Sequence, residues 1–355
     1  MKLAFIVYYM TYGGIERQIT MLANYMAKKG HDVSVLSFVG NKSCYKIDSK
    51  INYRFYPDKG NGFAKRLNRY KFMRKALKEV KPDITITFMP QSAYFCSFMP
   101  NEITGKLLYS ERGNPELRNH EFVQKIQEIL SFQKIDYFIF QTQGAREFYS
   151  RSIIKRSSVI PNPVFITEKI ENCTRRSRRI VNIGRLHSQK NQLLLINAFE
   201  KVHRVYPDYV LEIYGEGELE NTLKEQIIKL KLKDYVFLMG TYRDIHLRIN
   251  DAALFCLSSD YEGMPNALME AMALGIPCIS TDCDPGGARE IIHHGIDGLI
   301  VPKNNVNALA DAMIKILSHP QKSMAMGMAA KINMKRFEKE QIYGQWERCF
   351  YEILK

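Results

Sequence analysis

The sequence predicts an α/β protein with two domains, each built on a doubly wound, Rossmann-like parallel sheet. Strand-like apolar runs alternate with helix-like amphipathic segments throughout both halves, which is the pattern of parallel sheets. A chain of 355 residues is too long for one ordinary core and suits two domains of average size. No apolar run reaches the roughly 18 residues of a membrane span, so we expect a soluble protein.

Apolar runs of strand length mark the expected strands of both sheets. In the first half they lie at residues 3–9, 32–38, 83–88, 106–110 and 137–142. In the second half they lie at residues 178–186, 209–215, 236–240, 253–259 and 277–281. Helical patterns connect them, and the first such pattern ends at Gly30.

The two domains are expected to join near residues 159–179, where two prolines, polar residues and a basic cluster make a poor core element. We therefore expect an N-terminal domain at 1–160, a linker at 161–178 and a C-terminal domain at 179–337. A helix at 338–355 is expected to pack back on the N-terminal domain. Ligands bind beyond the carboxyl ends of parallel strands, so two facing sheets would form a cleft for two substrates.

The segment at residues 260–277 is the most informative for chemistry. It follows a strand, Pro265 suits the first turn of a helix, and Gly275 with Pro277 ends that helix. A helix N-terminus of this kind binds phosphate through its free N–H groups. The residues expected to form this donor-binding segment are Gly263, Met264, Pro265, Asn266, Ala267 and Leu268.

Two carboxylates flank this phosphate site. Glu262 lies in the loop before the helix, and Glu270 lies about one turn inside it. Paired carboxylates do not suit an anion, but they accept hydrogen bonds from sugar hydroxyls. Alternatively, both are solvated charges that the helix dipole favours, and the spacing alone does not separate the two interpretations.

The two glutamates also have the E-x7-E spacing of a known family, within the letters EGMPNALMEAMALGIP. Four further segments resemble motifs of that family: GGIERQITMLANYMAKKGHDV, NIGRLHSQKNQLLLINAF, IYGEGELENTLKEQI and STDCDPGGAREIIHHGIDGLIVP. Together they resemble the family 4 retaining glycosyltransferases of the GT-B fold, of the bacterial surface-polysaccharide type. The resemblance covers nearly the whole chain and is weaker across residues 40–155.

The resemblance implies roles for individual residues in binding a nucleotide-sugar donor. Arg185 and Lys190 would hold the donor diphosphate, which suits a guanidinium fork and an ammonium point charge. Glu262 would accept from a hydroxyl of the donor sugar, and Glu270 from the ribose hydroxyls. Glu262, Arg185 and Lys190 are thus the expected catalytic residues. Without the resemblance, Arg185 and Lys190 would suit an ordinary basic loop.

Glycines complete the expected donor site. Gly13 and Gly14 would form a tight loop near the leaving phosphate, because glycine lets backbone N–H groups approach closely. Gly215 and Gly217 lack the third glycine of a dinucleotide fingerprint, so their loop is expected near the nucleoside instead. Two further residues are expected to border the base: Tyr242 and Arg243.

We expect neither a metal nor a cofactor. Asp282, Cys283 and Asp284 form a D-x-D pattern, by which another transferase fold holds a metal, but here the pattern precedes a turn. In the resembled fold, basic residues and helix termini neutralise the leaving diphosphate instead. The seven cysteines form no C-x-x-C pair and their number is odd, which disfavours a zinc site or disulfide framework and fits a reducing cytoplasm.

One segment departs from the family pattern. Some members carry a histidine near the reacting centre, just after a strand of the N-terminal domain. The comparable segment here is residues 110–115, and Arg112 stands where that histidine would be. We therefore assign no histidine catalyst, and we expect Arg112 and Asn114 to contact the acceptor.

The net charge is unevenly distributed. Residues 1–160 hold 26 basic and 13 acidic residues, whereas residues 161–355 hold 25 and 24. Residues 62–81 combine eight basic residues and one acidic residue with apolar residues at helical spacing. This helix is either a core-packed element with a solvated basic face or a surface that binds an anionic membrane. The expected membrane-facing residues are Lys65, Arg66, Arg69 and Arg74.

We expect an enzyme that moves a hexose or N-acetylhexosamine from a UDP-sugar to a hydroxyl of a glycan, with retention of configuration. The acceptor would be linked to polyprenyl diphosphate, and the enzyme would lie on the cytoplasmic face of the cell membrane without spanning it. One alternative is a nucleotide-sugar epimerase of similar fold. Another is a non-catalytic protein that binds sugar nucleotides or nucleic acid, although no nucleic-acid-binding motif supports it.

Overall fold

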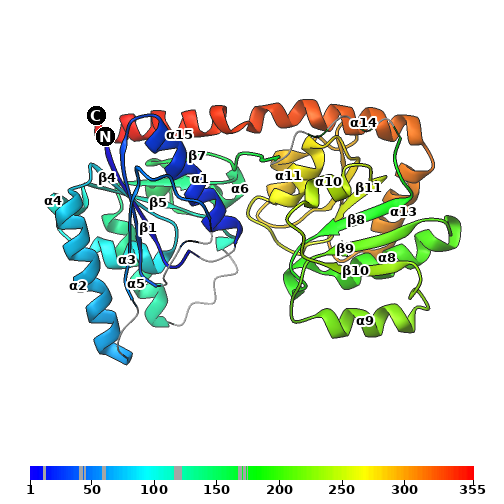
Figure 1. Cartoon of the computed structure of the whole chain (residues 1–355), viewed down its shortest axis with the longest axis horizontal. Coiled ribbons are helices and arrows are strands. Elements are labelled where there is room, and N and C mark those ends of the chain that lie inside the picture. Colours follow the sequence, from blue (N-terminus) through cyan, green and yellow to red (C-terminus); the bar gives the residue numbers. More distant parts are fainter. Residues whose placement is uncertain are drawn as a thin grey trace. The chain divides into compact units, whose positions relative to one another are not determined.

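The computed structural model describes every residue except 11–12, 40–42, 44, 58–60, 116–121, 167–169, 171–172 and 174. The chain divides into two compact units (Figure 1). Unit 1 comprises residues 1–162 and 340–355, and unit 2 comprises residues 163–339. Residues 163–178, which were expected to be a linker, therefore belong to unit 2, and part of that stretch lies outside the described residues.

Unit 1 is built on a seven-stranded parallel sheet in the order β3-β2-β1-β4-β5-β6-β7. Its strands are β1 (Lys2–Val7), β2 (Asp32–Ser37), β3 (Asn52–Phe55), β4 (Ile84–Thr87), β5 (Lys106–Ser110), β6 (Tyr137–Phe140) and β7 (Ser157–Val159). The five expected strands of the first half are present. The sequence did not indicate β3 and β7, because β3 is mostly half-buried or exposed and β7 has only three residues.

The helices of unit 1 are α1 (Gly14–Lys28), α2 (Gly62–Val80), α3 (Pro90–Ser97), α4 (Asn101–Thr104), α5 (Phe122–Lys134), α6 (Gln143–Glu147), α7 (Arg151–Ile154) and the C-terminal α15 (Lys339–Leu354). Most of these helices pack on this sheet, and α5 packs on α3. Gly30 has a φ of +88° just after α1, which explains why the helix ends there. The buried side chains of Trp346 and Phe350 anchor α15 within unit 1.

Unit 2 is built on a six-stranded parallel sheet in the order β10-β9-β8-β11-β12-β13. Its strands are β8 (Arg179–Ile183), β9 (Val210–Tyr214), β10 (Val236–Gly240), β11 (Leu254–Leu257), β12 (Cys278–Thr281) and β13 (Leu299–Val301). Its helices are η2 (Ser188–Lys190), α8 (Gln192–Val205), α9 (Glu220–Lys229), α10 (Ile245–Ile249), α11 (Asn266–Ala273), α12 (Gly287–Ile291), α13 (Val306–Leu317), α14 (Pro320–Asn333) and η3 (Met334–Phe337). The five expected strands of the second half are all present, and β13 is additional.

Both sheets are doubly wound, and each reverses its strand order at one point. In unit 1 the reversal lies between β1 and β4, and in unit 2 it lies between β8 and β11. The loops that leave the carboxyl ends of such a strand pair diverge and leave room for a ligand. The loops after β1 and after β8 and β11 are therefore the first places to look for a site. None of the described helices combines the length and apolarity that crossing a membrane requires.

Candidate active site

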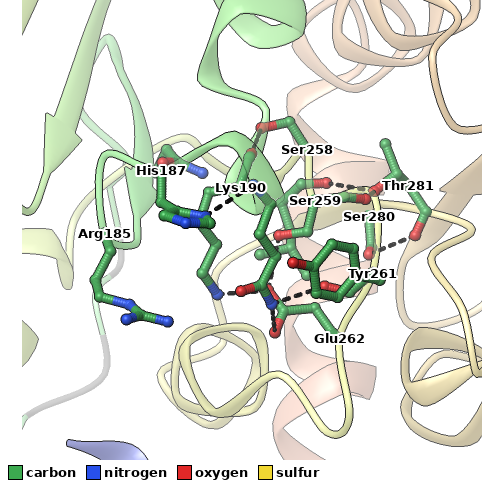
Figure 2. Close-up of polar contacts among 12 residues, drawn as sticks. Arg185, His187, Lys190, Ser258, Ser259, Tyr261, Glu262, Ser280 and Thr281 are labelled. Carbon is green, nitrogen blue, oxygen red and sulfur yellow. Dashed lines mark hydrogen bonds and ion pairs between the residues drawn. The ribbon is translucent and has the colours of Figure 1, made fainter. Parts of the chain in front are cut away.

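A lysine and a glutamate meet where the strand order of the unit 2 sheet reverses. Lys190 ends the loop after β8, and Glu262 lies in the loop after β11. The ammonium of Lys190 forms an ion pair with Glu262 Oε1, and the hydroxyl of Ser259 donates to the same oxygen over 2.7 Å (Figure 2). Because Glu262 is only 7% exposed, its carboxylate has lost most of its hydration and needs these donors.

Further hydrogen bonds join the same two loops. The amide N–H of Asp260 donates to the carbonyl of Gln189 over 2.9 Å, and the Gln189 side chain donates to the carbonyl of Tyr261 over 2.9 Å. The hydroxyl of Ser258 donates to the carbonyl of Lys190 over 2.8 Å. Hydrogen bonds to the backbone of both loops therefore hold them together, in addition to the ion pair between the two charged side chains.

Arg185 lies on the same loop as Lys190 but in a different environment. Its side chain is exposed, and in Figure 2 no drawn contact joins its guanidinium to the Lys190–Glu262 pair. Among the described residues it has no ion-pair partner, while its carbonyl is fixed by the Gln192 side chain over 2.9 Å. The structure thus separates two residues that the sequence analysis gave one role: Arg185 is an exposed cation, and Lys190 neutralises a buried carboxylate.

Helix α11 begins beside this pair. Pro265 is its N-cap and not its first helical residue, which corrects the expectation by one position. The first hydrogen bond of the helix runs from Met269 N to Pro265 O, so the N–H groups of residues 266–268 precede the helical ladder. The side chains of Met264 and Leu268 are buried, so in this segment it is backbone groups that could meet an anion. Gly275, with a φ of +72°, follows the helix end as expected.

The second glutamate is buried as well. Glu270 lies on α11 and is 7% exposed. Its Oε2 is 3.1 Å from Nε2 of His246, which lies on α10 and is 3% exposed. No motif in the sequence indicated a function for this histidine. The two residues are 24 positions apart, and only the packing of α10 on α11 brings them together.

Gly215 and Gly217 have a packing role at this site. A Cβ on Gly215 would lie 2.0 Å from the carbonyl oxygen of Gly184, and a Cβ on Gly217 would lie 2.3 Å from that of Leu186. No side chain fits at such distances. The glycines therefore let the loop after β9 lie directly on the loop that carries Arg185, whereas their contact with a nucleoside stays a prediction.

Tyr242 belongs to an aromatic and cationic stack after β10. The guanidinium carbon of Arg248 lies 3.8 Å from the centre of its ring, and Tyr214 meets it edge-on at 6.0 Å. Arg248 in turn donates to the carboxylate of Asp244 over 2.9 Å. Arg243 is exposed. The stack fixes the start of α10. That Tyr242 and Arg243 border the base of the donor remains a prediction.

In unit 1, Gly13 is the N-cap of α1 and Gly14 is its first residue. The hydroxyl of Tyr45 holds this turn from both sides: it donates to the carbonyl of Gly13 over 2.9 Å and accepts from its N–H over 3.0 Å. A Cβ on Gly13 would collide with the Glu16 carboxylate. Tyr45 was not predicted as a residue of this turn, because no sequence motif connects it with Gly13, 32 positions away.

Arg112 is in a different environment from the one expected of an acceptor-binding residue. Its guanidinium carbon lies 5.4 Å from the ring centre of Phe88 and 5.3 Å from that of Trp346, and it donates to Asn162 over 2.8 Å. Burial lowers the pKa of Arg112 to about 10. These internal contacts favour a structural role for Arg112 over the predicted acceptor binding. Asn114 is partly buried in the same loop.

Comparison with known proteins assigns this architecture to a family. A model described as "Glycosyltransferase Family 4" matches residues 12–168, and one described as "Glycosyl transferases group 1" matches residues 167–333. The two matches overlap at residues 167–168 and together span residues 12–333, which include every strand of the two sheets except β1. The chain belongs to the family 4 glycosyltransferases. It is therefore an enzyme, a hexosyltransferase, as the E-x7-E segment indicated.

Curated relatives and solved structures agree with this assignment. The glycosyltransferase is 26% identical, over 99% of both chains, to the Campylobacter jejuni GalNAc-alpha-(1->4)-GalNAc-alpha-(1->3)-diNAcBac-PP-undecaprenol alpha-1,4-N-acetyl-D-galactosaminyltransferase. It is 32% identical, over 45% of its length and 44% of the relative's, to the Escherichia coli UDP-Gal:alpha-D-GlcNAc-diphosphoundecaprenol alpha-1,3-galactosyltransferase. A crystal structure of Anabaena HepE in complex with UDP superimposes with a TM-score of 0.81 at 17% identity, over 99% of this chain and 100% of that one, which supports the expected GT-B fold.

The D-x-D pattern of this glycosyltransferase is engaged in ion pairs. Arg289 donates to both carboxylate oxygens of Asp282, and Lys303 pairs with Asp284. Burial raises the pKa of the Cys283 thiol between them to about 12, so it stays protonated at neutral pH. The described residues contain no group of three or more His, Cys, Asp and Glu side chains arranged to hold a metal ion.

The basic helix α2 only partly matches the expected membrane-facing surface. Arg66 and Arg74 are exposed and Lys65 is partly so, but Arg69 turns inward, lies over the ring of Tyr8 and donates to its hydroxyl over 3.0 Å. These contacts favour a packing role for Arg69 over the predicted membrane-facing one. Leu67, one of the apolar residues at helical spacing in this segment, is 41% exposed. A surface hollow runs beside α2, lined by Leu67, Tyr70, Lys71, Arg74, Lys75, Lys78 and Glu79.

Proposed function

We propose that this glycosyltransferase moves a hexose or N-acetylhexosamine from a UDP-sugar to a hydroxyl of a glycan linked to polyprenyl diphosphate, in the assembly of a cell-surface polysaccharide. The Campylobacter relative is named for an undecaprenol-linked acceptor, and the Escherichia coli relative for a UDP-galactose donor and a diphosphoundecaprenol acceptor. These names support the choice of donor and acceptor class.

The observation that carries the proposal is the Lys190–Glu262 ion pair beside Arg185 and the start of α11. In the proposed complex, the donor diphosphate lies between the Arg185 guanidinium and the first N–H groups of α11. Lys190 then shares its charge between Glu262 and the phosphate. Glu262 accepts a hydrogen bond from a hydroxyl of the donor sugar, and Glu270 accepts from the ribose.

The proposed reaction proceeds with retention of configuration. The acceptor oxygen forms a bond to the anomeric carbon on the face from which the UDP oxygen departs. The bond between that carbon and the UDP oxygen breaks, and its electrons stay on the diphosphate. The proton of the acceptor hydroxyl passes to the departing phosphate oxygen, so no separate base is required. Arg185, Lys190 and the α11 N–H groups stabilise the charge that develops on the diphosphate.

We propose that catalysis needs no divalent metal. Asp282 and Asp284 are neutralised by Arg289 and Lys303, so a metal would have to displace two cationic side chains to reach them. The basic groups at the reversal of the unit 2 sheet supply positive charge for the diphosphate without a metal ion.

The same proposal places the enzyme at the cytoplasmic face of the membrane, held by charge. The exposed lysines and arginines of α2 would meet anionic head groups, and each would contribute roughly 1 kcal/mol near such a surface. The binding would be peripheral and sensitive to salt.

A donor panel tests the proposed activity. The enzyme is incubated with different nucleotide sugars, with and without an extract of lipid-linked glycans, and both UDP release and the mass of the glycan are followed. We expect acceptor-dependent UDP release together with a gain of one hexose or N-acetylhexosamine. An epimerase would convert the donor without an acceptor, and a non-catalytic binding protein would give neither product; either result would overturn the proposal.

A further inference from the structure

The buried pair formed by His246 and Glu270 assigns a function to a histidine that the sequence left without one. Nε2 of His246 is 3.1 Å from Oε2 of Glu270, and both residues are almost fully buried. In the proposed function Glu270 is an ionised carboxylate, which can only accept hydrogen bonds, so the hydrogen is assigned to Nε2. The contact therefore specifies both the orientation of the ring and the nitrogen that is protonated.

This contact restricts where the Glu270 carboxylate can point. A glutamate has three side-chain torsions, and a fixed donor on one oxygen removes most of that freedom. We propose that His246 is a positioning residue, which holds Glu270 in the orientation that accepts hydrogen bonds from the vicinal ribose hydroxyls of the donor nucleotide. The inference rests on the proposed function, in which Glu270 contacts the ribose.

The position of His246 is itself fixed by the protein. α10 follows the Tyr242 stack, in which Arg248 packs on the Tyr242 ring and pairs with Asp244. One short segment after β10 therefore carries both the aromatic side chain that is predicted to border the base and the imidazole that orients Glu270. The segment would act on the two halves of the nucleoside together.

A comparison of two amide substitutions tests this role. In His246→Gln the amide nitrogen can occupy the place of Nε2 and still donate to Glu270. In His246→Asn the side chain is one carbon shorter, so its nitrogen falls near the place of Nδ1 and cannot reach. Both variants are polar, Gln is close to histidine in volume while Asn is smaller, and thermal unfolding establishes that each is folded.

The readout is calorimetric affinity for UDP and for 2′,3′-dideoxy-UDP, which lacks the ribose hydroxyls. We expect His246→Asn to weaken UDP binding by about tenfold and His246→Gln by less than about threefold, because only the former loses the hydrogen bond that orients Glu270. Neither substitution should change the affinity for dideoxy-UDP. His293→Ala provides a control, since it removes another histidine–carboxylate pair of unit 2, from Asp297, just before β13.

Three results would overturn the inference. Equal losses for UDP and dideoxy-UDP would mean that His246 only stabilises the fold. Unchanged UDP affinity in His246→Asn would mean that Glu270 needs no positioning. A tenfold loss in His293→Ala as well would remove the specificity of the effect. By contrast, absence of UDP binding in the unsubstituted enzyme would contradict the proposed donor, and with it the role of His246.

Discussion

The ammonium of Lys190 and the carboxylate of Glu262 form an ion pair that joins the loops after β8 and β11, 72 positions apart in the sequence. The two residues were expected to bind different parts of the donor, Lys190 the diphosphate and Glu262 a hydroxyl of the sugar. In the protein they neutralise each other, and Ser259 adds a hydrogen bond to the same carboxylate oxygen. In the proposed complex the charge of Lys190 is therefore divided between Glu262 and the diphosphate, so substitutions at Lys190 and Arg185 should have different consequences.

Arg185→Ala should reduce donor use without affecting the fold. Its side chain is exposed and makes no ion pair with the part of the chain that the structure describes, so the free energy of unfolding should change by less than about 0.5 kcal/mol. A charge-assisted hydrogen bond to phosphate is worth roughly 1.5–3 kcal/mol, so kcat/KM for the donor should fall about 10- to 100-fold. Steady-state kinetics and urea unfolding measure the two effects, and normal kinetics would remove Arg185 from the site.

Lys190→Ala should damage both donor use and stability. The substitution leaves the Glu262 carboxylate buried without its cation, and such a loss costs about 3–5 kcal/mol at a fully buried pair. The hydrogen bond from Ser259 and the remaining solvent exposure of Glu262 should keep the loss of unfolding free energy near the lower end of that range. The double variant Lys190→Met with Glu262→Gln removes both charges, and it should recover much of the stability but not the activity. If the single variant unfolds like the parent, the ion pair contributes nothing to the fold.

Ten strands were expected from apolar runs, and all ten are present. Parallel strands that are buried on both faces read as continuous apolar segments, so this signal is strong. The strands β3, β7 and β13 gave a weaker signal, because β3 is largely exposed and the other two have three residues each. The exact start of a helix is harder to predict from sequence. Proline suits both the N-cap and the first turn, and only the backbone angles show that Pro265 is the N-cap of α11.

The candidate site was predicted in its residues more than in its contacts. Glu262, Lys190 and Glu270 were identified from motifs that lie in continuous segments. Their partners are distant in the sequence and depend on how the strands order in the sheet. Two further contacts could not be predicted: that of Arg69 with Tyr8 and that of Arg112 with Trp346. The identity of a basic residue does not show whether its side chain faces solvent or packs on an aromatic ring.

The two glutamates should respond differently to neutralisation. Glu270→Gln should weaken binding of free UDP as well as of the UDP-sugar, since both carry the ribose. Glu262→Gln should mainly reduce turnover of the intact donor, because its proposed partner is a hydroxyl of the sugar. Calorimetry with UDP and kinetics with the UDP-sugar separate the two cases. Equal losses for both ligands in both variants would contradict this division of roles.

Arg112→Met should loosen the C-terminal helix without weakening UDP binding. The guanidinium packs against the rings of Phe88 and Trp346 and donates to Asn162, so its loss should cost about 1–3 kcal/mol of unfolding free energy. Trp346 is the only tryptophan, so its fluorescence reports directly on the packing of α15. We expect a red-shifted emission and a lower unfolding midpoint. An unchanged spectrum and midpoint, with a higher KM for the acceptor, would restore the acceptor-binding role.

Transfer should continue in the presence of EDTA. The carboxylates of the D-x-D pattern are paired with Arg289 and Lys303, and basic groups are already available for the diphosphate. The measurement is UDP release by enzyme that has been dialysed against chelator and assayed with and without added magnesium or manganese. Activity that disappears with EDTA and returns with either ion would show that a metal is required.

Membrane binding should depend on the outward-facing basic residues of α2 and not on Arg69. Vesicles rich in anionic lipid should co-sediment the enzyme at low salt, and neutral vesicles should not. Four exposed residues of the helix provide the test variant, in which each is changed to glutamate: Arg66, Lys71, Arg74 and Lys78. Each reversal replaces an attraction of about 1 kcal/mol by a repulsion, so sedimentation should be lost.

A second variant with the same change in net charge controls for long-range electrostatics. It reverses four exposed lysines of unit 2: Lys201, Lys229, Lys231 and Lys233. We expect this control, and also Arg69→Met, to sediment with anionic vesicles nearly like the parent, and all variants to bind UDP. Equal losses in both charge-reversed proteins would mean that net charge alone drives the attraction. Retained sedimentation of the α2 variant would mean that the helix is only a packed element of unit 1 with a solvated basic face.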